Sequence, residues 1–212
     1  MFSVIIPMAG FGVRTGLQVN KALYKIDEKP IFMFAFETFK KFDCEIILVC
    51  KEEDLSEVKK YAKGAKIIIG GASRSKSVLN GIKAATNDLI LIHDAARPFV
   101  TEEIINNTLA CMQNNKCAYV GVKVVDTIRD VDGFVLDRDR LISVQTPQAG
   151  FKDDFIKAFE LAGNDNLTDD VMYLSKYLGY KPEVVEGSRL NFKITTFDDI
   201  LLARSLWEES NV

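Results

Sequence analysis

Short apolar runs rich in β-branched residues alternate along the chain with longer segments in which apolar residues recur every three or four positions. Runs of the first kind predict strands at 3–7, 45–50, 65–70, 88–94 and 117–124. Segments of the second kind predict helices at 30–42, 52–63, 78–86 and from Thr101 onward. This alternation is typical of a mostly parallel sheet with crossover helices, so we expect a three-layer α/β/α, Rossmann-like fold.

The alternation stops between residues 124 and 145, where two short β-like runs flank the pair Asp132-Gly133. An Asp-Gly pair between alternating runs predicts a hairpin, here a β-arm that protrudes from the sheet. The remaining pattern predicts helices at 153–163 and 169–179, strands at 182–187 and 191–196, and a last helix from Asp198.

Length and composition change this picture little. The 212 residues suit one domain spanning 1–212, and 48% apolar residues are enough for a sizeable core. The net charge of −3, with mixed signs throughout, disfavours nucleic-acid binding. The longest apolar runs are strand-sized, and the first one begins at the amino terminus, so we expect neither a membrane span nor a leader, and a cytoplasmic location.

Cysteine and histidine usage argues against a protein metal site. The four cysteines have no CxxC spacing, and the one histidine, His93, has no second ligand near it in sequence. We expect free thiols and a histidine that is hydrogen-bonded inside the core.

The loop after the first strand carries the strongest chemical signal. Gly10, Gly12 and Gly16 allow backbone amides to approach a phosphate closely, while Arg14 and Lys21 supply positive charge. The spacing matches neither a P-loop nor a dinucleotide fingerprint. A glycine-rich turn alone is also compatible with an ordinary strand-to-helix connection, but the two cations favour a polyphosphate cradle.

Later loops offer further candidates. Residues 70–77 combine two glycines with three serines before a helix, which suits a base edge, an anion or a plain N-cap. Asp94 follows a strand, where it would meet a sugar hydroxyl or a metal-bound phosphate, and Arg97 is a phosphate clamp or the salt-bridge partner of Asp94. Lys193 lies in an apolar run. Its ammonium group therefore either contacts an anion or is solvated at the edge of a sheet.

Taken in order, the segments "PMAGFGVR", "NK", "GGASRSKSV", "HDAARPFV", "VVDTI", "QTPQ", "TDD", "VEG" and "NFKITT" resemble the cytidylyltransferases that make 4-diphosphocytidyl-2-C-methyl-D-erythritol from CTP and 2-C-methyl-D-erythritol 4-phosphate. The resemblance extends from about Val4 to Ala203. It implies a nucleotidyltransferase sheet, and a homodimer built through the β-arm.

The resemblance also implies roles for individual positions. Arg14, Lys21 and Lys193 would be catalytic, holding the phosphates and stabilising charge on the α-phosphate. The CTP-binding positions would be Met8, Ala9, Gly10, Gly12, Gly71, Ala72, Ser77, Asp94 and Ala95. Positions that bind the acceptor or hold the site together would be Arg97, Thr127, Arg138, Thr146 and Thr168. Arg138 would reach the acceptor of the other subunit, and Mg²⁺ would bind mainly to the CTP phosphates.

Met8 stands where this family usually has alanine, so a side chain turned inward would narrow the base pocket. Two other functions are compatible with the same loops. One is a nucleotidyltransferase acting on ribitol 5-phosphate or another sugar phosphate. The other is a nucleotide-binding module without catalysis, which would give no function to Arg138 and Lys193.

Overall fold

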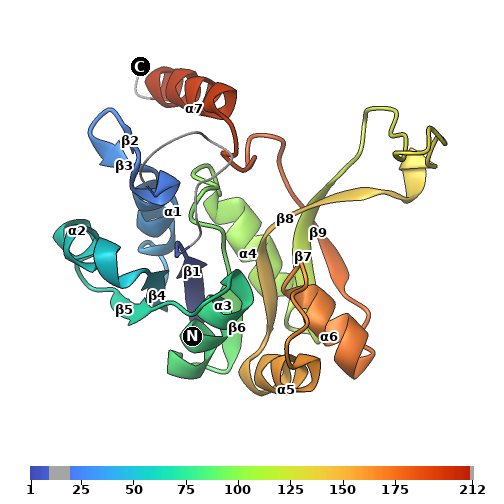
Figure 1. The fold of residues 1–212 in the computed structure, drawn as a ribbon, viewed down its shortest axis with the longest axis horizontal. Helices are drawn as coiled ribbons and strands as arrows, with labels where there is room; N and C mark the ends of the chain where they lie inside the picture. Colours follow the sequence, from blue (N-terminus) through green and yellow to red (C-terminus); the bar gives the residue numbers. More distant parts are fainter. Residues whose placement is uncertain (10–19, 211–212) are drawn as a thin grey trace.

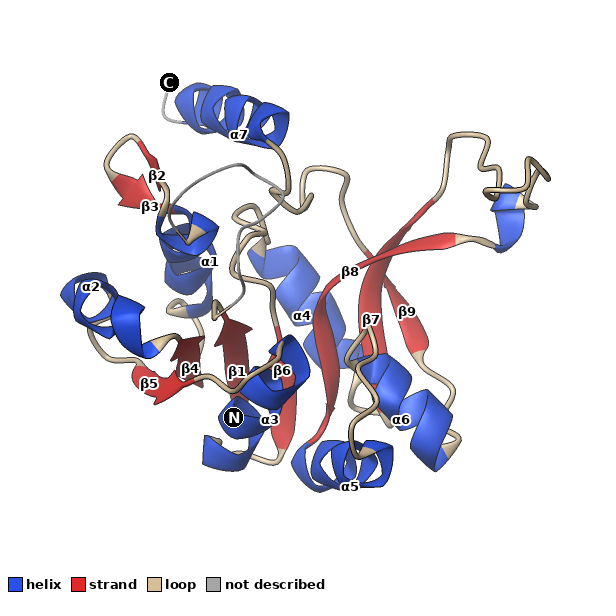
Figure 2. Cartoon of the chain, in the orientation of Figure 1, coloured by secondary structure: helices blue, strands red, loops and turns tan. Residues whose placement is uncertain are grey.

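The computed structural model of the chain describes residues 1–9 and 20–210. Its strands are β1 (Phe2–Pro7), β4 (Cys44–Cys50), β5 (Lys66–Ile69), β6 (Leu89–Ile92), β7 (Cys117–Lys123), β8 (Ile142–Phe151) and β9 (Glu183–Glu186). These strands form one sheet in the order β5-β4-β1-β6-β8-β7-β9 (Figures 1 and 2). A separate two-stranded ribbon pairs β2 (Lys25–Ile26) with β3 (Lys29–Pro30).

All neighbouring strands of the large sheet run parallel except β8, which is antiparallel to β6 and β7. The helices are α1 (Ile31–Phe39), α2 (Leu55–Tyr61), α3 (Arg74–Ala84), α4 (Glu102–Cys111), α5 (Lys152–Ala162), α6 (Val171–Leu178) and α7 (Phe197–Ser210). The 3-10 turns within the described residues are η2 (Lys21–Leu23), η3 (Glu52–Asp54) and η4 (Arg138–Arg140).

The central strand β1 shows why helices cover both faces of the sheet. Val4 and Ile6 pack into one apolar cluster with residues of α1, α2 and α4, whereas Ile5 packs into a second cluster with α3, α5 and α6. Successive side chains of a strand point to opposite faces, so a strand that is apolar at every position requires a cover on each side. The three layers and the mostly parallel sheet confirm the predicted fold class.

Helix starts follow the capping chemistry of the sequence. The Thr101 hydroxyl accepts a hydrogen bond from the Ile104 amide at 3.2 Å, as predicted for the cap of α4. Ser73 does the same for α3, accepting from the Lys76 amide at 3.1 Å. Helix α3 therefore begins at Arg74, four residues before the predicted start, and this places Arg74 in its first turn.

The β-arm is a protruding loop more than a β ribbon. The chain does reverse at Gly133, whose φ of +91° suits glycine, and the Asp130 amide donates to the Phe134 carbonyl at 2.9 Å. Only one isolated bridge, between Arg129 and Val135, joins the two sides of this arm in the described residues. The predicted hairpin reversal is confirmed, but the long strand that follows the arm is β8, which belongs to the central sheet (Figure 1).

The strand predicted at 191–196 is wrong. This segment is an irregular loop, tied to the loop after β6 by a hydrogen bond of 2.8 Å from the Ile194 amide to the Ala96 carbonyl. Ile194 is fully buried in a third apolar cluster, with residues of α1 and α7. The apolar residues of the 191–196 loop therefore pack between helices. Lys193, which lies between them in sequence, is thereby placed near the end of β6.

Candidate functional site

The carboxyl ends of β1 and β6 lie side by side, because the two strands pair in parallel with Ile5 opposite Ile92. The chain leaves β1 toward β4 on one side and returns as β6 on the other, and a sheet opens a crevice where its connections diverge in this way. Segments 7–9 and 93–97 follow these two strands and therefore meet at that crevice.

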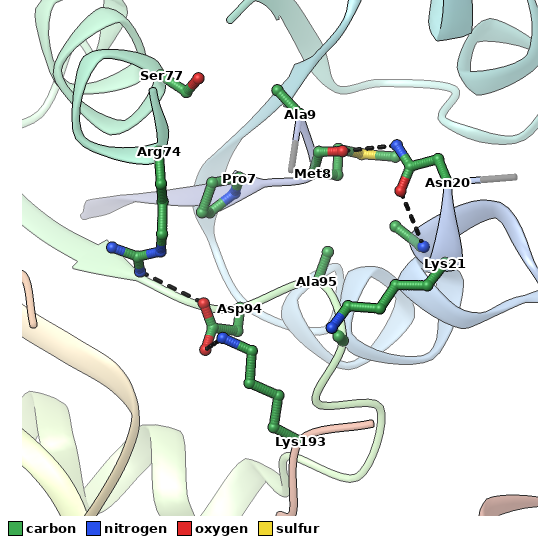
Figure 3. A pocket seen from close by; sticks show the side chains of 12 residues that line it. Pro7, Met8, Ala9, Asn20, Lys21, Arg74, Ser77, Asp94, Ala95 and Lys193 are labelled. Atoms are coloured by element: carbon green, nitrogen blue, oxygen red, sulfur yellow. Dashed lines mark hydrogen bonds and ion pairs between the residues drawn. The ribbon is translucent and has the colours of Figure 1, made fainter. Parts of the chain in front are cut away.

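A first hollow of about 180 Å³ lies at this crevice (Figure 3). Its walls come from the end of β1, the start of η2, the first turns of α3, the loop after β6 and the 191–196 loop. The lining residues are Pro7, Met8, Ala9, Asn20, Lys21, Ala22, Arg74, Ser77, Asp94, Ala95, Ala96 and Lys193. The sequence thus brings together side chains from five separate segments.

A second hollow of about 460 Å³ adjoins the first. Its lining residues are Arg74, Asp94, Arg97, Val144, Gln145, Thr146, Gln148, Asn166, Leu167, Thr168, Asp169 and Lys193. Arg74, Asp94 and Lys193 border both hollows, so the two spaces share one wall made of two cations and a carboxylate.

Asp94 is the centre of this shared wall. Lys193 Nζ lies 2.9 Å from Asp94 Oδ2, Arg74 Nη2 lies 3.3 Å from Oδ1, and Arg97 Nε lies 3.6 Å from Oδ2. Burial alone would raise the pKa of this carboxyl, but the charges of Arg74, Lys193 and Arg97 outweigh it and hold the pKa far below its usual range. Asp94 is therefore an anion, and Lys193 has the anionic partner that its apolar setting predicts.

Arg74 is the residue that sequence reasoning missed. Its Nη1 and Nη2 atoms donate to both carboxylate oxygens of the fully buried Asp170, at 2.7 and 2.6 Å, and Nη2 also reaches Asp94. Burial would lower the pKa of Arg74, but these two carboxylates raise it above its usual range. One signal was available: a cation in the first turn opposes the helix dipole, so it requires a partner outside the helix.

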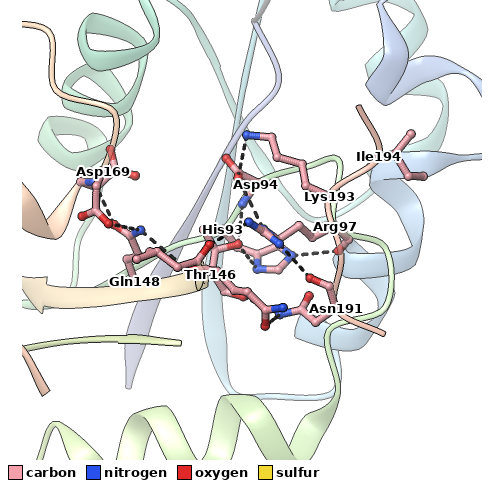
Figure 4. Close-up of polar contacts among 12 residues, drawn as sticks. His93, Asp94, Arg97, Thr146, Gln148, Asp169, Asn191, Lys193 and Ile194 are labelled. Atoms are coloured by element: carbon pink, nitrogen blue, oxygen red, sulfur yellow. Dashed lines mark hydrogen bonds and ion pairs between the residues drawn. The ribbon is translucent and has the colours of Figure 1, made fainter. Parts of the chain in front are cut away.

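His93 is completely buried, as predicted, and both of its ring nitrogens are hydrogen-bonded (Figure 4). Nε2 lies 3.0 Å from the Arg97 carbonyl, which only accepts, so Nε2 carries the hydrogen. Nδ1 then accepts from the Thr146 hydroxyl at 3.0 Å, and that hydroxyl accepts from the Asp94 amide at 3.1 Å. Burial lowers the pKa of His93 to about 4, so the ring is neutral and holds the loop of Asp94 in place.

Lys21 enters the first hollow from the start of η2. Its Nζ donates to the Ile194 carbonyl at 2.9 Å, which links it to the loop that carries Lys193. The preceding Asn20 caps η2 through the Ala22 amide and donates to the Met8 carbonyl and to Asp54, both at 2.7 Å. Asn20 therefore fixes where Lys21 begins relative to the end of β1.

Two cations, Arg74 and Lys193, thus border both hollows. The model of the 2-C-methyl-D-erythritol 4-phosphate cytidylyltransferase (IspD) family matches residues 2–209 of the chain. The chain belongs to this family. The family that the motifs resemble is thereby confirmed.

Individual cytidylyltransferases agree with this match. The curated 2-C-methyl-D-erythritol 4-phosphate cytidylyltransferase of Halalkalibacterium halodurans is 38% identical over 224 residues, covering 98% of this chain and 97% of the relative. That of Clostridioides difficile is 39% identical over 222 residues, covering 97% and 93%.

Solved structures of cytidylyltransferases share the fold. The 4-diphosphocytidyl-2C-methyl-D-erythritol synthase of Anaerococcus prevotii superposes with a TM-score of 0.83 at 30% identity, covering 98% of this chain and 96% of the other. The 2-C-methyl-D-erythritol 4-phosphate cytidylyltransferase of Thermus thermophilus gives 0.82 at 30%, covering 96% and 97%. These likenesses favour 2-C-methyl-D-erythritol 4-phosphate cytidylyltransferase activity over a ribitol 5-phosphate enzyme or a non-catalytic module.

The structure places most of the positions expected from the cytidylyltransferase motifs at the two hollows. Met8, Ala9, Lys21, Ser77, Asp94, Ala95 and Lys193 line the first, and Arg97, Thr146 and Thr168 line the second. Met8 is 3% exposed and also packs in the core, so its bulk forms part of the wall of the first hollow. Gly10, Gly12, Gly16 and Arg14 lie outside the described residues.

Four other expected positions, Gly71, Ala72, Thr127 and Arg138, line neither hollow directly. The Gly71 amide donates to Ser77 Oγ at 3.0 Å, so it contacts the first hollow through that serine, and Ala72 borders a separate hollow beside α5. Thr127 and Arg138 belong to the arm, where Arg138 Nη1 donates to the Val125 carbonyl at 2.7 Å. Among the described residues, no group of three or more His, Cys, Asp or Glu side chains is arranged to hold a metal ion.

All four cysteines are free thiols, as the sequence predicts. Within residues 1–9 and 20–210, every helix is too short or too polar to cross a bilayer.

Proposed function

We propose that the chain transfers CMP from CTP to 2-C-methyl-D-erythritol 4-phosphate and releases pyrophosphate, in non-mevalonate isoprenoid precursor synthesis. The observation that carries this proposal is the wall shared by the two hollows, formed by Arg74, Asp94 and Lys193. Two anionic reactants must meet at one phosphorus atom, and the barrier lies largely in positioning them and offsetting their charge. A cationic wall between adjoining hollows meets both requirements.

The reaction needs no general base. A phosphate oxygen of the acceptor, already an anion because the second pKa of a phosphate monoester is about 6, attacks the α-phosphorus of CTP. The bond from that phosphorus to the bridging oxygen breaks, and pyrophosphate leaves with the electron pair. His93, the one histidine of the chain, has both ring nitrogens engaged inside the core and takes no part in proton transfer.

Cations supply the stabilisation of charge. In the proposal, Lys21 holds the triphosphate and the α-phosphate in the first hollow, together with Arg14. Lys193 lies in the wall between the hollows and orients the α-phosphate or the acceptor phosphate. Its ammonium group contacts Asp94 at 2.9 Å, so an entering phosphate shares or replaces a carboxylate partner. The lysine is thus in place before the substrates bind.

The rest of the first hollow would hold the nucleoside. Met8 and Ala9 line it just after β1, Ser77 lines it from α3, and the backbone groups of Gly71 and Ala72 lie just before α3. Gly10 and Gly12 are proposed to contribute backbone amides as well. In the proposal these groups recognise cytosine. Asp94 and Ala95, at the end of β6, would face the ribose.

We assign the second hollow to the polyol phosphate. Arg97 and Thr146 line this hollow, but their polar groups already hydrogen-bond to other parts of the protein. Arg97 Nη1 donates to the Asn191 carbonyl at 2.8 Å, and the Thr146 hydroxyl bridges His93 and the Asp94 amide. These two residues would hold the site together, while Thr168 contacts the acceptor.

Thr127 and Arg138 would act from the arm of a second subunit. The arm carries exposed apolar side chains, with Val131 fully exposed and Phe134 at 71%, as expected of a surface that a partner covers. We therefore propose a homodimer joined through the arm, and a cytoplasmic location in keeping with four free thiols.

Mg²⁺ is proposed as the cofactor. Asp94 is the one carboxylate that lines the first hollow within the described residues, and its depressed pKa keeps it ionised. Mg²⁺ commonly binds one or two carboxylates together with substrate phosphates and waters, so this donor set fits. Because Lys193 and Arg74 already contact both oxygens of Asp94, the CTP phosphates would provide most of the ligands. The bound ion would offset charge on those phosphates.

Replacing Lys21 tests the proposal. In a pyrophosphate-release assay with CTP and 2-C-methyl-D-erythritol 4-phosphate, Lys21→Ala should lower kcat/KM by about 10²–10³, equivalent to roughly 3–4 kcal/mol of transition-state stabilisation. Lys63→Ala, an exposed lysine beyond α2, is the matched control and should retain full activity. Unchanged turnover by Lys21→Ala, or equal use of ribitol 5-phosphate by the wild type, would contradict the proposal.

A further inference from the structure

The second hollow has its charges arranged unevenly. Arg74 and Lys193, in the wall shared with the first hollow, gather around Asp94 together with Arg97. Figure 4 shows Asp169 on the far side of Thr146 and Gln148 from Lys193, so Gln148 and Asp169 mark the opposite end of the hollow. Thr168, which precedes Asp169, also lines the hollow. A ligand in this hollow therefore meets cations at one end and an acid with neutral polar groups at the other.

Asp169 is held rigidly at the acidic end. Its Oδ1 accepts from the Met172 amide at 2.9 Å, and its Oδ2 accepts from Gln148 Nε2 at 3.1 Å. Gln148 cannot turn over, because its Oε1 accepts from the Asp170 and Val171 amides at 2.8 and 3.0 Å. The carboxylate is thus positioned by its neighbours before any ligand binds.

Asp169 also has acceptor capacity left over. A carboxylate offers about four lone-pair positions, and two are used by Met172 and Gln148. None of the ion pairs among the described residues includes Asp169, in contrast to Asp94 and Asp170. Burial raises its pKa, and the charge of Asp170 raises it further, which shows that this carboxylate lacks compensating charge. Hydroxyl groups are the donors that suit it, whereas a phosphate would be repelled.

We propose that Asp169 is a specificity-determining residue that accepts hydrogen bonds from the hydroxyl groups of the acceptor polyol. With the hydroxyl end held at Asp169, the phosphate end points to Lys193 and Arg74, toward the first hollow. This inference rests on the proposed function and adds to it the way in which the acceptor is oriented. It also predicts that an uncharged, hydroxyl-bearing chain is required beyond the phosphate.

The test pairs an enzyme variant with a substrate that lacks the hydroxyls. Asp169→Asn retains an oxygen able to cap α6 but removes the charge. Loss of charged hydrogen bonds worth about 1.5–3 kcal/mol corresponds to a rise of about 10- to 150-fold in KM for 2-C-methyl-D-erythritol 4-phosphate, with KM for CTP unchanged. Butyl phosphate, which has no hydroxyl groups, should be a poor acceptor that wild type and variant use equally.

Two controls make the outcome decisive. Asp153→Asn, an exposed acid in the first turn of α5, should leave both Michaelis constants unchanged. Asp169→Ser keeps a capping oxygen on a shorter side chain, and it should repeat the effect if Asp169→Asn folds poorly. An unaltered acceptor KM in the folded variants, with an active wild type, would overturn this inference alone. An inactive wild type would overturn the proposed function instead.

Discussion

Replacing Arg74 should leave the buried carboxylate of Asp170 without its cationic partner. Asp170 is fully buried, and every hydrogen bond that its carboxylate makes within the described residues comes from Arg74, through a bidentate contact of 2.6 and 2.7 Å. Alanine at position 74 leaves that carboxylate without a partner, and it must then remain as a desolvated anion or take up a proton.

The size of the effect follows from the burial of the two groups. Breaking a buried ion pair by removing one partner costs about 3–5 kcal/mol, whereas an exposed pair contributes about 0–1 kcal/mol. The Arg74 side chain is 33% exposed while Asp170 is not exposed at all, so we expect the lower end, about 3 kcal/mol. That is a large part of a typical stability of about 5–15 kcal/mol. Asp170→Asn should cost less, because Arg74 still contacts Asp94 and no buried anion remains.

Urea denaturation at pH 7 of Arg74→Ala, Asp170→Asn and the double variant measures these terms as a double-mutant cycle. The double variant should be at least 1 kcal/mol more stable than the sum of the single changes predicts, because removing the anion relieves the isolated charge. Lys76→Ala removes an exposed cation from the same helical turn and controls for the helix dipole. A loss below about 0.5 kcal/mol in Arg74→Ala, or strict additivity, would refute the reasoning.

Two further predictions concern His93 and Gly81. The unfolded chain binds a proton at His93 below about pH 6.5 but the folded protein only below about 4, so stability should fall by roughly 3 kcal/mol as pH drops through this window. His93→Gln should flatten that part of the pH profile in thermal melts, and an unchanged slope would exclude His93 as its source. A Cβ at Gly81 would lie 2.5 Å from Ile5 Cγ2 and 2.9 Å from Val49 Cγ2. Gly81→Ala should therefore lower stability by about 1–3 kcal/mol in urea, although alanine favours helices, and a gain would contradict this packing argument.

The sequence predicted those elements whose pattern is set by their own residues. Strand β1 is apolar at successive positions because helices cover both faces, and the cap at Thr101 is chemically local. The start of β8, up to residue 145, was assigned to the arm, and its remaining part, 146–151, was missed for the opposite reason. It carries Pro147 and polar residues, and proline normally argues against a central strand because it cannot donate to the ladder. The register between β7 and β8 shifts at this point, between Tyr119 and Gly121, so Pro147 lies where regular pairing is interrupted.

The prediction of a strand at 191–196 was wrong because the packing of this segment depends on contacts that no local pattern reveals. Its alternating apolar residues resemble a strand, but Ile194 packs against α1 and α7 instead of a neighbouring strand. Whether an apolar residue packs in a sheet or between helices depends on partners far away in sequence, which periodicity does not contain. Arg74 was missed because its partners, Asp94 and Asp170, are 20 and 96 positions away. The motif around it was recognised, but the role of its cation depends on tertiary contacts.

The two buried acids explain how a phosphate site can be assembled before phosphates arrive. Arg74, Arg97 and Lys193 would repel one another around Asp94 if they stood alone, and the cost would be high where water is partly excluded. Asp94 contacts all three cations and Asp170 contacts Arg74, so in the described residues three positive charges face two negative ones. In the proposed function, an entering phosphate would compete with Asp94 for Lys193 at the wall, while Asp170 would continue to hold Arg74. In this arrangement Asp94 is the exchangeable counter-ion of Lys193, and Asp170 is the permanent counter-ion of Arg74.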